Sequence, residues 1–243
     1  TGSFSGTATF GSISLTSSGY HDIFVAKIDP LGQVIWATSA GGAQANDAGT
    51  SIVARPDGSA VLTGWFRGTA TFGGIQQTAS GDGIFVARIA PDGTFTSVVS
   101  SAGTNGDASD TQISALPDGS AIISGTFYRT RAFGGTTLVS EGSSDVFIAK
   151  INADNSFGWA TRAGGTGQET LGGLTVLADG SAVITGGFND TAHFGDTTLV
   201  ATDSGSPSRP DFSDFREPDV FVAKVNGDGS FAWARQAGGS TFD

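Results

Sequence analysis

The chain has no cysteine and no methionine, and its 243 residues include only seven prolines and two histidines. Without cysteine it can form no disulfide bond, no thiol-based active site and no cysteine-ligated zinc or iron–sulfur centre. Basic residues are scarce too. Twelve Lys and Arg stand against 23 Asp and Glu, a net charge of −11, which argues against nucleic acid or anionic lipid as a partner. No run approaches the roughly 18 apolar residues of a membrane-spanning helix, so we expect no membrane insertion.

Catalytic signatures are also missing. A Ser-His-acid triad needs a histidine, and the chain offers only His21 and His193. The other copies of the repeat described below have Thr9, Thr71 and Ala132 at the position of His193. No His-x-x-x-His pair, Gly-x-Ser-x-Gly elbow or phosphate-binding loop occurs. Paired carboxylates from different parts of the chain leave glycoside hydrolysis open, but we expect a protein that is not an enzyme.

Glycine is abundant, with 38 residues, and together with Thr, Ser and Val it favours short strands and tight turns over helices. One seven-residue pattern recurs four times and has a phenylalanine at its third position, namely Phe24, Phe85, Phe147 and Phe221. The spacings are 61, 62 and 74 residues, which indicates a repeat of about 60 residues with one insertion in the last copy. Self-similarity at such a period is typical of arrays built from one supersecondary unit.

Each copy is predicted to contain four antiparallel strands. In the first complete copy we expect them at 51–55, 59–66, 84–89 and 95–100, with a long excursion between the second and third. An Asp-Gly pair between apolar runs is a strong hairpin signal. The aspartates that we interpret as turn formers are Asp57, Asp92, Asp118, Asp179 and Asp228.

The predicted fold class is all-β, with the four repeats as blades of a β-propeller that is part of a longer one. The third strand is apolar on both faces, as in Ile84-Phe85-Val86-Ala87, which is typical of a strand buried between two layers. Blades packed face to face supply both layers. We expect one domain over 1–243. Its repeats fall at about 1–42, which lacks the first strand, then 43–103, 104–165 and 166–243, with the insertion within 201–218. The open blade edges predict self-association.

The repeat resembles the bacterial seven-bladed β-propeller-type repeat, often called the SBBP repeat. The matching features are Asp-Ile-Phe-Val-Ala-Lys at 22–27, a turn glycine, a Trp, Ala-Gly-Gly, and Val-Leu-Thr-Gly at 61–64. The opening segment, 1–11, is similar to a longer variety found in secreted and surface proteins of myxobacteria and related groups. The resemblance implies a propeller scaffold outside the cell or on its surface, although this sequence shows no signal peptide. It implies no shared reaction.

Two places are candidate contacts for a ligand or partner. Trp65 stands where the other copies have Ser3, Thr126 and Gly187, which predicts an exposed or pocket-lining ring. The insertion combines aromatic rings with both signs of charge. Its candidate residues are Arg209, Asp211, Phe212, Asp214, Phe215 and Arg216.

Carboxylates in the loops that join successive copies are the weak candidates for metal ligands. They are Asp47, Asp107, Asp110 and Glu169, which occupy near-equivalent places and are expected to face solvent along one edge. Calcium needs several converging oxygens, and no loop here matches the density of Asp-x-Asp-x-Asp-Gly. Calcium therefore stays an alternative, and no other cofactor is expected.

These features favour a non-catalytic extracellular or cell-surface scaffold that presents loops to a protein or glycan partner. The alternative is a carbohydrate-binding, lectin-like propeller, with or without calcium. A third and weaker alternative is a polysaccharide hydrolase or lyase. Trp36, Trp159 and Trp233 recur at one position of the repeat and are expected to serve packing.

Overall fold

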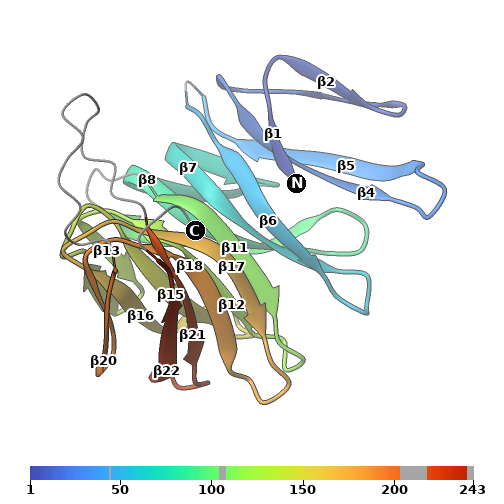
Figure 1. Ribbon diagram of the computed structural model, residues 1–243. Coiled ribbons are helices and arrows are strands. Elements are labelled where there is room, and N and C mark those ends of the chain that lie inside the picture. The colour runs from blue at the N-terminus through green and yellow to red at the C-terminus, as the bar shows by residue number, and fades with distance from the viewer. Residues whose placement is uncertain (44, 104–107, 203–217, 240–243) are drawn as a thin grey trace.

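The computed structural model describes residues 1–43, 45–103, 108–202 and 218–239 of the chain, and it is built from antiparallel β-strands (Figure 1). Within these ranges it has 22 strands and no helix, so the predicted all-β class is confirmed. No helix in the described part of the chain has the length and apolar character that crossing a membrane requires.

Every strand lies within one of the four predicted repeats. The first repeat contains β1 (Gly2–Phe4), β2 (Thr7–Phe10), β3 (Ile13–Thr16), β4 (Asp22–Ile28) and β5 (Val34–Gly41). The second contains β6 (Ala48–Ala54), β7 (Ala60–Phe72), β8 (Ile75–Ile89), β9 (Phe95–Ser100) and β10 (Ala102–Gly103). The third contains β11 (Ala108–Ala115), β12 (Ala121–Phe127), β13 (Thr130–Phe133), β14 (Thr136–Val139), β15 (Asp145–Ile151) and β16 (Phe157–Gly165). The fourth contains β17 (Glu169–Val176), β18 (Ala182–Phe188), β19 (Thr191–Phe194), β20 (Thr197–Val200), β21 (Asp219–Val225) and β22 (Phe231–Ala237).

The last three repeats each form a four-stranded antiparallel sheet whose strands follow chain order. The sheets are β6-β7-β8-β9, β11-β12-β15-β16 and β17-β18-β21-β22. We call the four positions strands a, b, c and d. The first repeat supplies strands b, c and d as β1, β4 and β5.

The predicted Asp-Gly turns are confirmed. At the first of them the Asp57 carboxylate accepts the backbone N–H of Ser59 at 2.9 Å, and Gly58 adopts a left-handed φ of 82°. The same hydrogen bond recurs at the other four turns. Because these bonds stabilise the charged form, hydrogen bonds from the Ser or Thr two residues on hold the pKa of all five carboxyls below the usual range.

The prediction of four strands per repeat was incomplete, because the excursion between strands b and c is itself a hairpin. It is formed by β2–β3, by the outer parts of β7 and β8, by β13–β14 and by β19–β20. This hairpin pairs with strand d of the preceding repeat, as in Gly41↔Thr71 and Gly164↔His193. In the third repeat it pairs instead with the short β10, which follows strand d of the second repeat. The hairpin therefore draws part of its pairing from a neighbouring repeat, which the pattern of a single copy does not contain.

The core lies between consecutive repeats. Three hydrophobic clusters each join side chains of one repeat to side chains of the next. Their largest members include Phe85, Phe147 and Phe221 of strand c, which are fully buried. Each of these rings lies opposite a glycine of strand b. A Cβ on Gly64, for example, would be 2.8 Å from the Phe85 ring, so only glycine leaves room for it there.

The recurring tryptophans pack between repeats. Trp36 Nε1 donates a hydrogen bond to the carbonyl of Pro91 at 2.8 Å, and Trp159 Nε1 donates one to the carbonyl of Gly227 at 2.9 Å. Both acceptors lie in the turn between strands c and d of the following repeat. The expected packing role is therefore confirmed for these two residues, and it acts across repeats.

Candidate functional site

Strand a is irregular at the same level in each of the last three repeats. Its pairing with strand b breaks between Gly49 and Ser51, between Ser109 and Gln112, and between Leu171 and Gly173. Each break is a β-bulge, which leaves residues unpaired and re-aims their side chains. Bulges of this kind are enriched next to binding and active sites, so this level of the three sheets is where we look for one.

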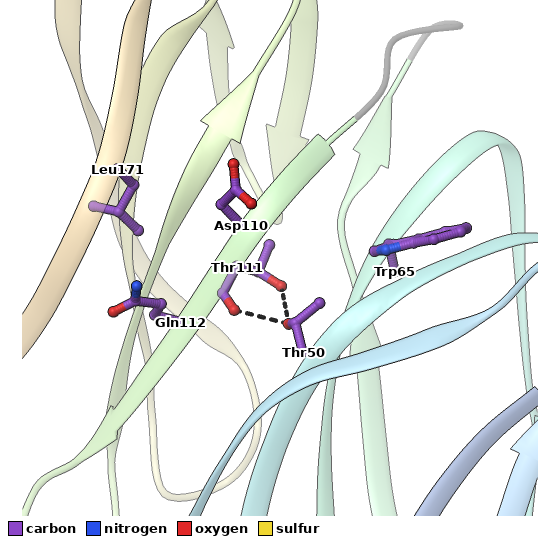
Figure 2. A pocket seen from close by; sticks show the side chains of 6 residues that line it. All are labelled: Thr50, Trp65, Asp110, Thr111, Gln112 and Leu171. Atoms are coloured by element: carbon purple, nitrogen blue, oxygen red, sulfur yellow. Dashed lines mark hydrogen bonds between the residues drawn. The ribbon is translucent and has the colours of Figure 1, made fainter. Parts of the chain in front are cut away.

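The bulges of neighbouring repeats are hydrogen-bonded to each other. Strand β11 lies between β6 and β17 and contacts both (Figure 1). The Thr50 hydroxyl donates to the carbonyl of Thr111 at 2.7 Å and lies 2.5 Å from its hydroxyl (Figure 2). On the other side, the Gln112 side-chain amide donates to the carbonyl of Gly172 at 3.2 Å. The three irregular segments thus form one continuous surface.

A hollow of about 430 Å³ opens on this surface, within the size range of small-molecule sites. Its lining residues come from three repeats and are Thr50, Trp65, Asp110, Thr111, Gln112 and Leu171 (Figure 2). Trp65 and Asp110 lie on opposite sides of the Thr50–Thr111 pair (Figure 2). The hollow therefore combines one aromatic ring, hydroxyl and amide groups, and one carboxyl group.

Asp110 has an unusual backbone at this place. Its φ is 56°, in the left-handed region that asparagine and aspartate visit more readily than other residues with a Cβ. The residue is exposed and belongs to the bulge of β11. Backbone strain of this sort tends to occur at functional sites, and here it accompanies a carboxyl group at the hollow.

The structure brings only some of the predicted contact residues to this site. Trp65 is half-exposed and lines the hollow, as its odd place in the repeat predicts. The predicted residues of the insertion, from Arg209 to Arg216, lie outside the described residues. Thr50, Gln112 and Leu171 were not predicted, because a bulge in strand a leaves no mark in the alternation of apolar and polar residues.

The expectation of a solvent-facing set of carboxylates is wrong for two of its four members. Of the three members that the structure describes, Asp47 and Glu169 are fully buried and Asp110 is exposed. Asp47 accepts the backbone N–H groups of Gly42 at 2.8 Å and Arg67 at 3.0 Å. The main chain thus turns these carboxyls inward. Asp107 lies outside the described residues.

Asp47 and Glu169 are equivalent residues, and each lies beside a buried aspartate of strand c. Burial raises the pKa of Asp47 to about 6, and the charge of neighbouring Asp22 adds to this effect. Burial raises the pKa of Glu169 to about 8, with the charge of Asp145 acting in the same direction. Glu169 is therefore mostly protonated at neutral pH, whereas Asp47 is mostly ionised there and becomes protonated below about pH 6.

The Asp145–Glu169 pair is the more tightly enclosed of the two. Glu169 Oε2 accepts the N–H of Gly165 at 3.2 Å, and Arg162 pairs with Asp145 at 2.5 Å. Asp145 Oδ1 and Glu169 Oε1 are buried and have no donor among the described residues. A proton on Glu169 leaves a single negative charge in the pair, because two adjacent buried carboxyls do not both ionise.

Between the second and third repeats a buried arginine takes part in the junction. Arg131 stands where the other copies have Ala8, Ala70 and Ala192. Its Nη1 donates to the carbonyl of Asp82 at 2.8 Å and to the Ser101 hydroxyl at 3.1 Å. Burial lowers the pKa of Arg131 to about 10, which leaves it charged at neutral pH.

No set of three or more His, Cys, Asp or Glu side chains in the described ranges is close enough to hold a metal ion. The lining of the hollow offers a single carboxyl group, and the two buried pairs are enclosed. The calcium alternative finds no positive support in this geometry.

The chain matches no family model and no curated protein. Among solved structures it is similar to two variants of the Synechocystis apocarotenoid oxygenase, at 10% identity and a TM-score of 0.44, over 96% of this chain and 48% of theirs. The chain thus spans about half the length of these proteins. It is also similar to a protein of unknown function from Bacteroides caccae, at 11% identity and a TM-score of 0.30, over 88% of this chain and 90% of that one. Likenesses this distant carry no functional argument.

Proposed function

We propose that the chain is part of a β-propeller that acts as a non-catalytic binding scaffold outside the cell or on its surface. Four-stranded sheets in chain order, each joined to the next by a hydrophobic cluster, support a blade arrangement. The resemblance of the repeat to the SBBP type supports the extracellular setting. The partner is a protein or glycan that binds at the hollow.

One observation carries the choice of site. Three consecutive repeats break the register of strand a at the same level, and side chains from all three line one hollow. Function in a repeat scaffold is usually carried by such irregular segments on a rigid frame.

Carbohydrate binding is the second candidate, and the lining favours it specifically. Trp65 provides a half-exposed ring, and aromatic rings offer a flat apolar face on which a sugar ring can stack. Thr50, Asp110 and Gln112 provide the hydroxyl, carboxyl and amide groups that bind sugar hydroxyls. Glycoside hydrolysis uses a pair of carboxyl groups, and the described lining has one, so it does not support the hydrolase or lyase alternative.

A glycan array, together with a panel of extracellular proteins, tests this proposal. The array is probed with and without calcium, using the natural chain, Trp65→Ala and the control Tyr20→Ala, whose ring is 67% exposed at another place. We expect a ligand whose binding falls at least about tenfold in Trp65→Ala, since buried aromatic contacts dominate binding energies, and stays unchanged in Tyr20→Ala. Equal binding by both variants would reject the hollow as the site. Failure on every glycan would reject the lectin alternative.

A further inference from the structure

In two of the three contacts between consecutive repeats, a tryptophan covers a glycine turn. These contacts lie at the end of the sheets that carries the a–b and c–d turns, which we call the turn rim. Where the first and second repeats meet, a Cβ on Gly93 would be 2.8 Å from the Trp36 ring. Where the third and fourth repeats meet, a Cβ on Gly229 would be 2.9 Å from the Trp159 ring. Both contacts therefore place an indole against a turn residue that has no side chain.

Where the second and third repeats meet, the sequence departs from this pattern at three positions. Ser97 replaces the tryptophan, and Asn155 replaces the turn glycine while keeping a left-handed φ of 70°. Arg55, just after strand a of the second repeat, stands where the later repeats have Leu116 and Leu177. Each change puts a polar side chain where the other copies have an apolar one or none.

Arg88 takes the place of the missing indole. It lies opposite Ser97 in the pairing of strands c and d, and it reaches across to the c–d turn of the third repeat. Its guanidinium donates to the carbonyl of Asn152 at 2.9 Å and to the side-chain oxygen of Asn155 at 3.2 Å. Both acceptors are neutral, so these bonds position the guanidinium without compensating its charge.

Arg55 crosses the same contact. Its Nη2 donates to the carbonyl of Gly119, in the a–b turn of the third repeat, at 2.5 Å. Its Nε is buried and has no acceptor among the described residues. The two turns that receive the arginines adjoin, since a Cβ on Gly119 would be 3.2 Å from the Cβ of Ala153. Two half-buried arginines of the second repeat therefore reach neighbouring turns of the third.

Neither arginine has a carboxylate partner. No ion pair joins Arg55 or Arg88 to an Asp or Glu in the part of the chain that the structure describes. By contrast, Lys224, the strand c residue equivalent to Arg88, pairs with Asp179 of its own repeat at 3.1 Å. The second repeat has the equivalent Asp57, but Arg88 bonds to the third repeat instead.

The charges of the two arginines act on each other. Burial lowers the pKa of Arg88, and the charge of Arg55 acts in the same direction, while that of Asp154 opposes it. The carboxylates of Asp57 and Asp154 accept hydrogen bonds from the serines two residues on in their own turns, and neither pairs with an arginine. Because like charges repel, an anion that bound both guanidiniums would relieve this repulsion.

We propose that Arg55 and Arg88 form a binding site for a tetrahedral oxyanion, a phosphate or sulfate group, on the turn rim. Guanidinium groups present parallel N–H donors that match such an anion, and they stay charged at physiological pH. Two of them fit an anion with close to two negative charges, as a phosphate ester has at neutral pH. The site is separate from the hollow, because Arg55 follows the last residue of β6 whereas the bulge at Gly49 and Ser51 lies near the first.

Isothermal titration calorimetry at constant ionic strength, with chloride as the background anion, tests this site. The probes are sodium phosphate, sodium sulfate and glucose 6-phosphate, of which the last presents the phosphate group as an ester. We expect one saturable site in the natural chain. Binding of the ester at least as tightly as inorganic phosphate supports the site and assigns the group to a larger ligand. Binding of the inorganic ions alone supports the site and assigns a free ion.

Two leucine variants locate the binding. Arg55→Leu gives the second repeat the residue type that the third and fourth have at this position, so far-UV circular dichroism should show an unchanged fold. It should weaken binding at least about tenfold, because a hydrogen bond to a charged group contributes that much. Arg235→Leu is the matched control, since it removes an exposed arginine of the fourth repeat, and it should bind as the natural chain does.

Arg88→Lys separates the shape of the guanidinium from its charge. Lysine is the residue of the other three copies at this position, and it keeps the charge without the fork of parallel donors. We expect this variant to bind several-fold more weakly than the natural chain, and unchanged binding would overturn the assignment of Arg88. A natural chain that binds none of the probes at millimolar concentrations would overturn the proposal, and so would equal binding by Arg55→Leu and Arg235→Leu.

Discussion

Replacing Glu169 by Gln should remove most of the pH dependence of stability that the Asp145–Glu169 pair causes. The pKa of Glu169 is about 8 in the folded chain against an ordinary 4.5, so the folded state binds this proton more tightly than the unfolded state. The stabilisation is complete below about pH 4.5 and is lost as the pH rises to about 8. The Gln side chain is neutral throughout and can keep the bond to the Gly165 N–H.

The magnitude follows from the size of the shift. At about 1.4 kcal/mol for each pH unit, the change from 4.5 to about 8 corresponds to about 4–5 kcal/mol of unfolding free energy. That is a large part of the roughly 5–15 kcal/mol by which a domain is stable. At about 2–4 °C per kcal/mol for a chain of this size, the natural chain should melt about 10 °C lower at pH 9 than at pH 5 on account of this residue.

The assay is urea unfolding from pH 4.5 to 9, followed by tryptophan fluorescence and extrapolated to water. The control is Glu141→Gln, which removes an exposed carboxyl that pairs with the same Arg162 and should leave the pH profile nearly unchanged. The reasoning is refuted if the profiles of the natural chain and Glu169→Gln run parallel across this range.

The remaining predictions concern the contact between the first and second repeats. Asp47→Asn should flatten the fall in stability between about pH 4 and 6, while leaving the profile above pH 7 unchanged. The effect is worth about 3 kcal/mol for a pKa raised from 3.8 to about 6, and the same urea titrations, extended down to about pH 3.5, measure it. Gly93→Asn should cost about 2 kcal/mol through its clash with Trp36, and less than about 1 kcal/mol in a Trp36→Ser background. Equal costs in the two backgrounds, measured in a double-mutant cycle, would show that the Gly93 turn is not fitted to the Trp36 ring.

The features of the fold that depend on residues close together in the sequence were predictable. The repeat period, the chain-order strands and the Asp-Gly turns depend on residues near each other in the sequence, and they are confirmed. Strand d of the first complete copy was predicted at 95–100 and runs from Phe95 to Ser100. The hairpin between strands b and c was missed because its outer strand pairs with the preceding repeat, at a separation that a single copy does not reveal.

The candidate site was less predictable for a related reason. Trp65 was found because it differs from its equivalents in the other copies. Thr50 and Gln112 were missed, since a bulge shifts which residues face outward without changing their type. The buried state of Asp47 and Glu169 also escaped prediction. Their partners are backbone N–H groups, which every sequence offers, so the residues alone do not tell a displayed carboxyl from an enclosed one.

Hydrogen exchange measured with a bound ligand tests the central claim most directly, namely that the irregular a strands form the binding surface. With a ligand identified on the array, we predict slower exchange in peptides that cover Ala48–Ala54, Ala108–Ala115 and Glu169–Val176. Peptides of the hairpins β2–β3 and β13–β14 should exchange at their free rate. Protection confined to those hairpins, with strands β6, β11 and β17 unaffected, would contradict the account.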